Sequence, residues 1–173
     1  MAKQEIVITG ISAHTTVVKH FDELIEALEA SKDLRLLILR PDYKSFEEME
    51  DWEHMKIVAE IRSAEIRSVI QSVKLHGIDQ FDNFEMRFMR RIPSFTGIMI
   101  DGDVNHKGKT PRDSEGQVRV QPTSTHSTQH RGVILQFRKK TNFPNGAFDF
   151  FAEDMRKQWQ KGVPLKDLPS DIY

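Results

Sequence analysis

Hydroxyl, imidazole and guanidinium side chains that follow apolar segments are the candidates for chemistry in this chain of 173 residues. Ser12, His14 and Thr15 lie between an apolar run and the start of an expected helix. Free backbone N–H groups at such a start attract anions, and these side chains can add hydrogen-bond donors. Arg40, at an expected strand end, and Arg62, on an expected helix, are the candidate cations. The set predicts a phosphate-like ligand; the alternatives are simple helix capping, a solvated His14 and an Arg62 that extends to water.

A second group of candidates lies in the hydroxyl- and histidine-rich segment 122–131, where Thr123, Ser124 and His126 can face a phosphate. His126 and His130 are four residues apart, and on a helix they would offer two zinc ligands on one face. The segment is typical of a loop, however, and no third ligand is near. We therefore predict no metal site, and the alternative to a phosphate-facing loop is a solvated polar turn.

Composition narrows the function classes. Lys and Arg number 25 against 26 Asp and Glu, so the net charge of −1 makes nucleic acid an unlikely partner. The chain has no cysteine, which excludes disulfides, thiolate metal sites and cysteine nucleophiles. No apolar run approaches the roughly 20 residues needed to span a bilayer, and the first residues lack the pattern of a secretory signal. These features predict a cytoplasmic protein without membrane contact, and no cofactor is expected.

Alternating apolar segments predict an α/β fold, a mixed β-sheet flanked by helices. Strands are expected at 5–9, 34–39, 84–89, 95–100, 117–121 and 133–137. Helices are expected from a Thr15 or Thr16 cap through Leu28, from a Ser45 capping box to His76, and after Gly146.

One domain is predicted at 1–161, followed by a C-terminal tail at 162–173. In open α/β sheets, ligands bind beyond the carboxyl ends of the strands. The expected ends are 10–15, 40–42 and 101–103, with the 122–131 loop as a further candidate, so the site is expected there.

The order of these segments resembles the phospholipase D-like superfamily. The residues that resemble it are VITGISAHTT, LRLLILRPD, PSFTGIMIDG and a closing helix with an F-x-x-F…W pattern, over nearly the whole chain from Glu5 to Trp159. The relatives it is most similar to are small, degenerate bacterial members, often fused behind a helix-turn-helix regulator. The resemblance implies a phospholipase D-like sandwich.

The resemblance also implies that the catalytic chemistry is lost. Active members carry His-x-Lys, four residues and then Asp, and the same spacing here gives Ser94, Thr96 and Asp101. Ser94 has no activating base in this motif, and Thr96 brings no positive charge to a phosphoryl group. The place of the family's second Gly-Ser-x-Asn turn is taken by residues 122–125, which do not match it. A strand with small polar residues and a turn-forming Asp101 is the purely structural alternative.

We therefore expect a non-catalytic phospholipase D-like module that binds a small anionic, phosphate- or nucleotide-like ligand or a partner chain. Active single-domain relatives pair as two-fold dimers, which implies a homodimer or pairing with another such chain, in a signalling, regulatory or defence role. One alternative is a phosphodiesterase or nuclease with Asp101 and replacement groups: His126 or His14 as nucleophile, and Lys107 or Lys109 as cation. A deoxyribosyltransferase-like domain is a third, with Asp42 and Asp101 as its only candidate carboxylates.

Overall fold

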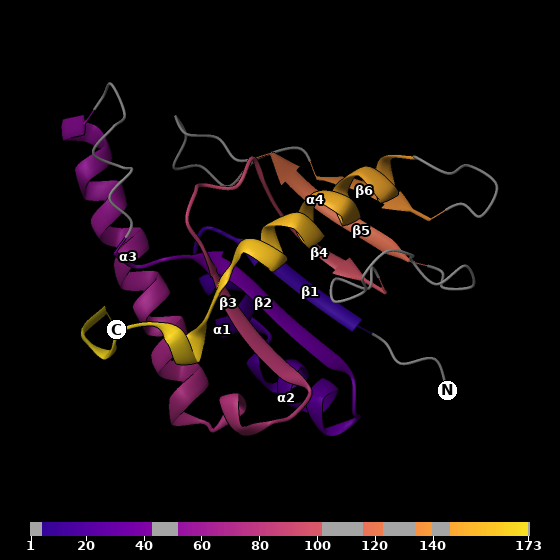
Figure 1. The fold of residues 1–173 in the computed structure, drawn as a ribbon, viewed down its shortest axis with the longest axis horizontal. Coiled ribbons are helices and arrows are strands. Elements are labelled where there is room, and N and C mark those ends of the chain that lie inside the picture. The colour runs from indigo at the N-terminus through magenta and orange to yellow at the C-terminus, as the bar shows by residue number, and fades with distance from the viewer. Residues whose placement is uncertain (1–4, 43–51, 102–115, 123–133, 140–145, 173) are drawn as a thin grey trace.

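The fold is built on one seven-stranded mixed sheet, open at both edges, with strand order β6-β5-β4-β1-β2-β3-β7 (Figure 1). The structure is a computed structural model. It describes residues 5–42, 52–101, 116–122, 134–139 and 146–172. The strands are β1 (Glu5–Gly10), β2 (Asp33–Leu39), β3 (Phe84–Met89), β4 (Phe95–Ile100), β5 (Gln117–Pro122), β6 (Leu135–Arg138) and β7 (Val163–Pro164).

The sheet has a parallel half and an antiparallel half. β1, β2 and β3 run parallel to one another, whereas β4 pairs antiparallel with β1, and β5 and β6 continue antiparallel beyond it. The short β7 is the outermost strand at the other edge, where it pairs antiparallel with β3. The direction of β4 decides which polar residues come together. Because β4 is antiparallel, its first residues, and not its last, lie beside the carboxyl ends of β1–β3.

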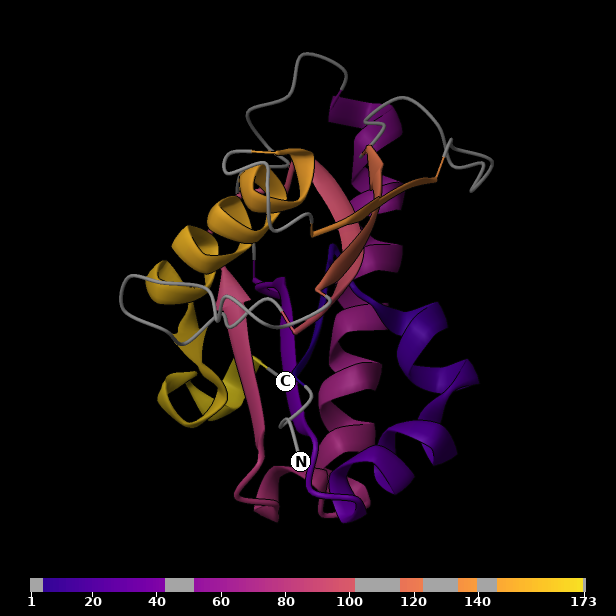
Figure 2. The same ribbon diagram turned by 90° about the vertical axis from the view of Figure 1, so that its right-hand side faces the viewer.

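Helices cover both faces of the sheet, which gives three layers (Figure 2). One face carries the first three helices, and the opposite face carries α4. The helices are α1 (His14–Lys19), α2 (Phe21–Glu29), α3 (Trp52–Leu75) and α4 (Ala147–Lys161). Three short 3₁₀ helices complete the fold: η2 (Ile78–Gln80), η3 (Leu165–Asp167) and η4 (Ser170–Ile172).

The core lies on both faces of the central strands. Leu36, Leu37, Ile38 and Leu39 of β2 are all at most 2% exposed, as expected for a continuous apolar run covered on both sides. From α4, the side chains of Phe148, Ala152, Met155 and Trp159 are buried at 2% exposure or less. The helix expected after Gly146 therefore packs on the sheet through one apolar face, to which Phe151 adds a half-buried ring.

Most predicted elements are confirmed within one or two residues, but the first helix is not. It divides at His20 into α1 and α2. Its N-cap is Ala13 in a left-handed conformation, with φ of 51° and no side-chain cap, so Thr15 and Thr16 lie inside the first turn. The Ser45 capping box lies outside the described residues.

The segment after Lys161, expected as a tail, packs on the domain. Val163 pairs with Phe88 in the sheet, Leu168 is 5% exposed, and the carbonyl of Ile172 accepts a hydrogen bond from Arg67 Nε at 3.1 Å. Residues 162–172 are therefore part of the packed structure. Across the described ranges, no helix is both long and apolar enough to cross a bilayer.

Candidate functional site

The candidate site is the edge of the sheet at which β1, β2 and β3 end, which we call the carboxyl edge. The three strands are parallel, so Gly10, Leu39 and Met89 all lie at this edge. β4 is antiparallel to β1, so it starts here with Phe95. Backbone hydrogen bonds tie the segments beyond the strands together: Leu39 N donates to Ile11 O at 2.9 Å, and the amide of residue 40 donates to Met89 O at 3.1 Å.

The connection 90–94 crosses the whole carboxyl edge. It joins β3 to β4, and β2 and β1 lie between those two strands in the sheet (Figure 1). Three strand spacings of about 4.8 Å make a crossing of roughly 14 Å. Arg90, Arg91 and Ser94 are exposed along it, while Pro93 is buried. Arg90 and Arg91 directly follow β3 and Ser94 directly precedes β4, so two cations and a hydroxyl group lie at the two ends of a connection that passes the ends of β2 and β1.

A carboxylate from α3 organises the part of the edge beyond β1. Ser12 Oγ donates a hydrogen bond to Glu65 Oε2 at 2.7 Å, and Arg62 Nη1 reaches the same oxygen at 2.7 Å. The side chains of Arg62 and Glu65 are 21% and 24% exposed, and Ser12 is 6% exposed. The backbone N–H of His14 lies 3.4 Å from Ser12 Oγ, a longer and weaker contact. Arg62 is thus held at the sheet edge by Glu65.

The turn after β2 holds the other predicted cation in a paired state. Arg40 makes a fork-like, two-bond contact with Asp42, Nε to Oδ1 at 2.9 Å and Nη2 to Oδ2 at 2.6 Å. The hydrogen bond to Asp42 raises the pKa of Arg40 further above its already high value. Ser63 Oγ donates to Pro41 O at 2.6 Å and fastens α3 to this turn. Both predicted cations are therefore close to the same stretch of α3.

The surroundings of Glu65 favour its charged form. Burial raises the pKa of Glu65, but the hydrogen bonds from Ser12 and Arg62, with the positive charges of Arg62 and His14, outweigh burial and hold the pKa below its ordinary value. A carboxyl whose folded pKa is lowered stabilises the fold above its unfolded pKa. That stabilisation is lost as the pH falls through the folded value.

Replacing this carboxylate should therefore cost stability only where it is charged. We expect Glu65→Gln to lower the free energy of unfolding by about 1 kcal/mol at neutral pH, because a charge-assisted, partly exposed contact becomes neutral. The difference from the unsubstituted protein should shrink below the ordinary Glu pKa of about 4.3. Urea unfolding over a pH series measures it. Glu60→Gln, an exposed change on the same helix, is the control, and a pH-independent difference would contradict the assignment.

The remaining predicted residues divide between the carboxyl edge and other places. Ser94 and Thr96 lie at or next to the edge, and Thr96 Cγ2 is 3.7 Å from the position that a Cβ on Gly10 would occupy. Thr15 is exposed on α1. Several other predicted residues lie outside the described residues: Thr123, Ser124, His126, His130, Lys107 and Lys109.

The prediction that Asp101 joins this edge is wrong. It assumed that every strand ends at the same side, but β4 is antiparallel, and its last residue Ile100 lies opposite Ile6 near the start of β1. Asp101 therefore lies at the opposite edge, about 20 Å from Ser94 along a strand of this length. There its Oδ1 accepts a hydrogen bond from Glu5 N at 3.0 Å, and its own N–H donates to Glu5 O at 2.8 Å.

Asp101 is thus a structural residue that fastens the start of β1. Its φ of 55° is left-handed, a conformation that Asn and Asp tolerate better than most residues. We expect Asp101→Ala to lower the free energy of unfolding by about 1–2 kcal/mol, since it removes this acceptor at a left-handed position. Asp101→Asn should keep most of the stability, because the amide oxygen can still accept. Chemical denaturation measures both, and equal losses would contradict this role.

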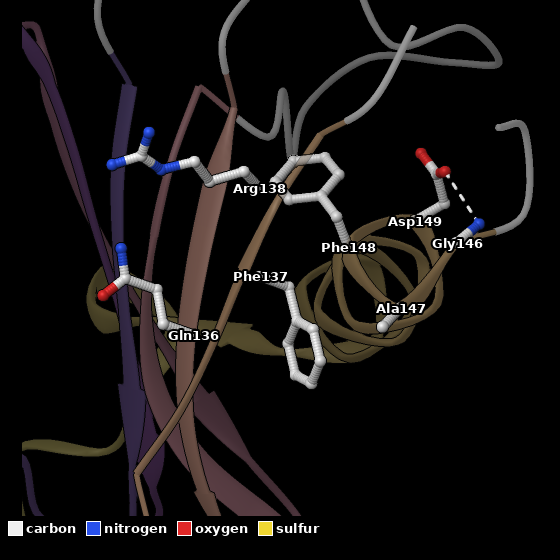
Figure 3. A pocket seen from close by; sticks show the side chains of 7 residues that line it. All are labelled: Gln136, Phe137, Arg138, Gly146, Ala147, Phe148 and Asp149. Atoms are coloured by element: carbon white, nitrogen blue, oxygen red, sulfur yellow. Dashed lines mark hydrogen bonds between the residues drawn. The ribbon is translucent and has the colours of Figure 1, made fainter. Parts of the chain in front are cut away.

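A hollow of about 290 Å³ lies elsewhere, between β6 and the start of α4 (Figure 3). Its lining residues are Gln136, Phe137, Arg138, Gly146, Ala147, Phe148 and Asp149. In Figure 3 the side chains of Gln136 and Arg138 point away from α4, whereas Phe137 points toward it. Asp149 Oδ2 is already occupied by Gly146 N at 3.2 Å. No residue predicted as a binding residue lines this hollow.

Sequence reasoning missed Arg90, Arg91 and Glu65. The two arginines follow a strand directly, as Arg40 does, and that position was a usable signal. Glu65 had no such signal in the sequence, because its role depends on the packing of α3 beside Ser12, which a local pattern does not show. Within the described parts of the chain, no group of three or more His, Asp or Glu side chains lies so as to hold a metal ion.

Comparison with known proteins adds no relative. No protein-family model, no curated protein and no solved structure matches this chain. The α/β architecture and the arrangement at the carboxyl edge are therefore the basis for any statement about function.

Proposed function

We propose that this chain is a non-catalytic, phospholipase D-like module that binds a small phosphate-containing anion at its carboxyl edge. The observation on which the proposal rests is the crossing of residues 90–94 over the ends of β2 and β1. It places two exposed arginines on the same edge as Ser12 and Arg62. Ligands of open α/β sheets bind beyond such strand ends.

The charges at this edge support an anionic ligand. Arg40 and Arg62 are each paired with a carboxylate. Among the described residues, Arg90 and Arg91 have no hydrogen bond or ion pair, so the edge has two guanidinium groups open to a ligand. Guanidinium groups match the geometry of phosphate oxygens and bind them through paired hydrogen bonds.

The positions of the motif residues argue against catalysis at that motif. In the Ser94, Thr96 and Asp101 motif, Ser94 and Asp101 lie at opposite ends of β4. Asp101 therefore cannot reach a ligand that is held near Ser94. His14 is the remaining described candidate for a nucleophile. Its ring makes no hydrogen bond within the described residues, and Glu65 acts on it only through charge, so no hydrogen-bonded base there orients the ring as a nucleophile.

The partner and the setting of this module stay predictions. A two-fold dimer, or pairing with a second phospholipase D-like chain, follows from the resemblance, and native mass spectrometry of the purified protein tests it. The cytoplasmic location and the signalling, regulatory or defence role are likewise expectations from the sequence.

Binding of phenyl phosphate, measured by calorimetry and by thermal unfolding, tests the proposed site. We expect millimolar or tighter affinity, and at 100 times the dissociation constant the ligand should add about 2.7 kcal/mol of stability. The double variant Arg90→Ala/Arg91→Ala should weaken binding at least about tenfold, because two cations that touch the ligand are lost. Both side chains are exposed, so the fold should be unaffected.

The matched control is Arg119→Ala/Arg138→Ala. It also removes two exposed arginines, but from β5 and β6, away from the carboxyl edge. This variant should bind phenyl phosphate as the unsubstituted protein does. Equal weakening by both double variants would mean that only the overall charge matters, and absence of binding to the unsubstituted protein would refute the site. Metal-independent hydrolysis of a fluorogenic phosphodiester, lost in His14→Ala, would favour an enzyme instead.

A further inference from the structure

The two outermost strands of the sheet differ in their protection against pairing with another chain (Figure 1). β7 has two residues and ends in Pro164, and short edge strands with a proline resist such pairing. At the other edge, residues 134–137 contain no proline and no charged side chain. Ile134 and Leu135 are 67% and 39% exposed there. Of the two edges, the one formed by β6 is therefore the one that can accept a further strand.

The hydrogen-bond pattern identifies the residues of β6 whose backbone faces outward. Lys139 N donates to Gly116 O at 2.7 Å, in line with the antiparallel ladder between β5 and β6. Residues that bond to the neighbouring strand alternate along such a ladder, so residues 135 and 137 bond to β5. The backbone N–H and C=O groups of Ile134, Gln136 and Arg138 therefore point away from β5.

An apolar surface runs from β6 onto α4. The ring of Phe137 stacks on that of Phe151 with centroids 5.4 Å apart, and Phe151 meets Phe150 edge to face at 5.3 Å. Leu135 lies two positions from Phe137 and so shares its face of the sheet. Phe150 is 68% exposed. A strand added beyond β6 would cover Leu135 and continue this apolar surface.

We propose that β6 pairs antiparallel with β6 of a second copy of this chain, across a two-fold axis at Gln136. Outward-facing residues bond to outward-facing residues, so Ile134 lies opposite the partner's Arg138, and Gln136 lies opposite the partner's Gln136. Between them, Leu135 meets the partner's Phe137 on the face that carries α4. The inference gives a surface to the two-fold dimer expected from the resemblance, and it does not depend on phosphate binding.

The distribution of charge along the strand favours a second copy in this register. Residues 134–137 are uncharged, and Arg138 and Lys139 follow them. In the antiparallel pair, the basic end of each strand lies beside the uncharged start of the other, so like charges are not opposed. A register centred on Arg138 would instead place two guanidinium groups opposite each other. The pairing occupies this edge in both copies, so the assembly closes at two chains.

Sedimentation equilibrium of the full chain over a concentration series tests the proposal. The monomer has a mass of 20.1 kDa, and we expect a reversible dimer of twice this mass with a micromolar dissociation constant, because the interface is small. Leu135→Lys should weaken association at least about tenfold, since it places an ammonium group against the partner's Phe137 twice across the axis. Leu75→Lys is the matched control, because Leu75 is 83% exposed on α3, and it should leave association unchanged.

A single cysteine locates the contact, because the natural chain has none. In Gln136→Cys the two cysteines should lie on the axis with Cα atoms about 5.5 Å apart, so a short bismaleimide should join them rapidly. Gln71→Cys, at an exposed position of α3, is the control and should react much more slowly between chains. Should Leu135→Lys fold poorly, Gln136→Pro provides the second variant, since it removes an outward N–H and no hydrogen bond to β5.

The possible results separate this interface from other surfaces and from the phosphate site. A dimer that is weakened in Leu135→Lys or Gln136→Pro and is captured through Gln136→Cys supports the proposal. A monomer at every concentration overturns it. A dimer that these substitutions leave intact, or that Gln71→Cys captures as fast as Gln136→Cys, shows that another surface is used. Polymers larger than a dimer overturn the closed two-fold pairing. If the dimer forms as described but phenyl phosphate does not bind, the interface stands and the phosphate site is wrong.

Discussion

Replacing Trp159 with alanine is expected to lower the free energy of unfolding by about 3–5 kcal/mol. Trp159 is 1% exposed and is the largest fully buried side chain among the described residues. Its ring lies beneath Arg87 of β3, with Cζ 4.8 Å from the ring centroid, and Arg87 Nη1 also donates to the backbone carbonyl of Trp159 at 3.1 Å. Truncation would remove the indole from between α4 and the sheet and leave a cavity.

Urea denaturation of Trp159→Ala measures this loss. Domains have a total stability of about 5–15 kcal/mol, so this loss is a large part of the whole. The urea concentration at the unfolding midpoint should therefore be much lower for the variant than for the unsubstituted protein. Phe150→Ala is the control on the same helix, because Phe150 is 68% exposed, and it should change stability much less. A loss below about 1 kcal/mol for Trp159→Ala would show that α4 is not packed as described.

Replacing Gly97 with alanine is the second change for which we expect a large effect. A Cβ on Gly97 would lie 2.3 Å from the backbone oxygen of Arg119, closer than real Cβ contacts allow. Because the obstacle is the backbone of β5, a side-chain rotation cannot relieve it. β4 and β5 must move apart where Gly97 lies opposite Val120, at an expected cost of about 3 kcal/mol.

The matched control is Gly10→Ala. At Gly10 the nearest atom to an added Cβ would be Ala13 N at 3.6 Å, an ordinary van der Waals contact. This variant should stay within roughly 1 kcal/mol of the unsubstituted protein. Amide hydrogen exchange adds a local measurement: Gly97→Ala should speed exchange in β4 and β5 more than in β2 and β3. Equal stability of the two variants would contradict the close approach of β4 and β5.

Local sequence patterns predict the elements of this fold better than their arrangement. Continuous apolar runs locate β1 and β2, because strands that are buried on both faces need apolar residues at every position. The stripe that includes Met155 and Trp159 locates α4 for the same physical reason. The break between α1 and α2 was not predicted, because it occurs at His20. No Gly or Pro, the residues that usually mark a helix end in a sequence, lies there.

The candidate site was predicted in part, for a reason that lies in strand direction. Ser12 and Arg62 are brought close together, joined by Glu65, because the carboxyl-edge rule holds for the parallel strands. Asp101 was placed at the wrong edge, because the direction of β4 depends on pairing between distant segments. Arg90 and Arg91 acquire their position only when the strand order is known, since that order sends their segment across the edge.

The position of α4 has a consequence for synthesis of the protein in the cell. The helix covers a sheet face that includes strands of both halves, yet it follows β1 to β6 in the chain (Figure 2). A ribosome adds about 5–20 residues per second. There is therefore an interval in which β1 to β6 have been synthesised but the apolar sheet face that α4 covers is still exposed to water. We expect chaperones that recognise such surfaces to hold the chain during that interval, until α4 has been translated.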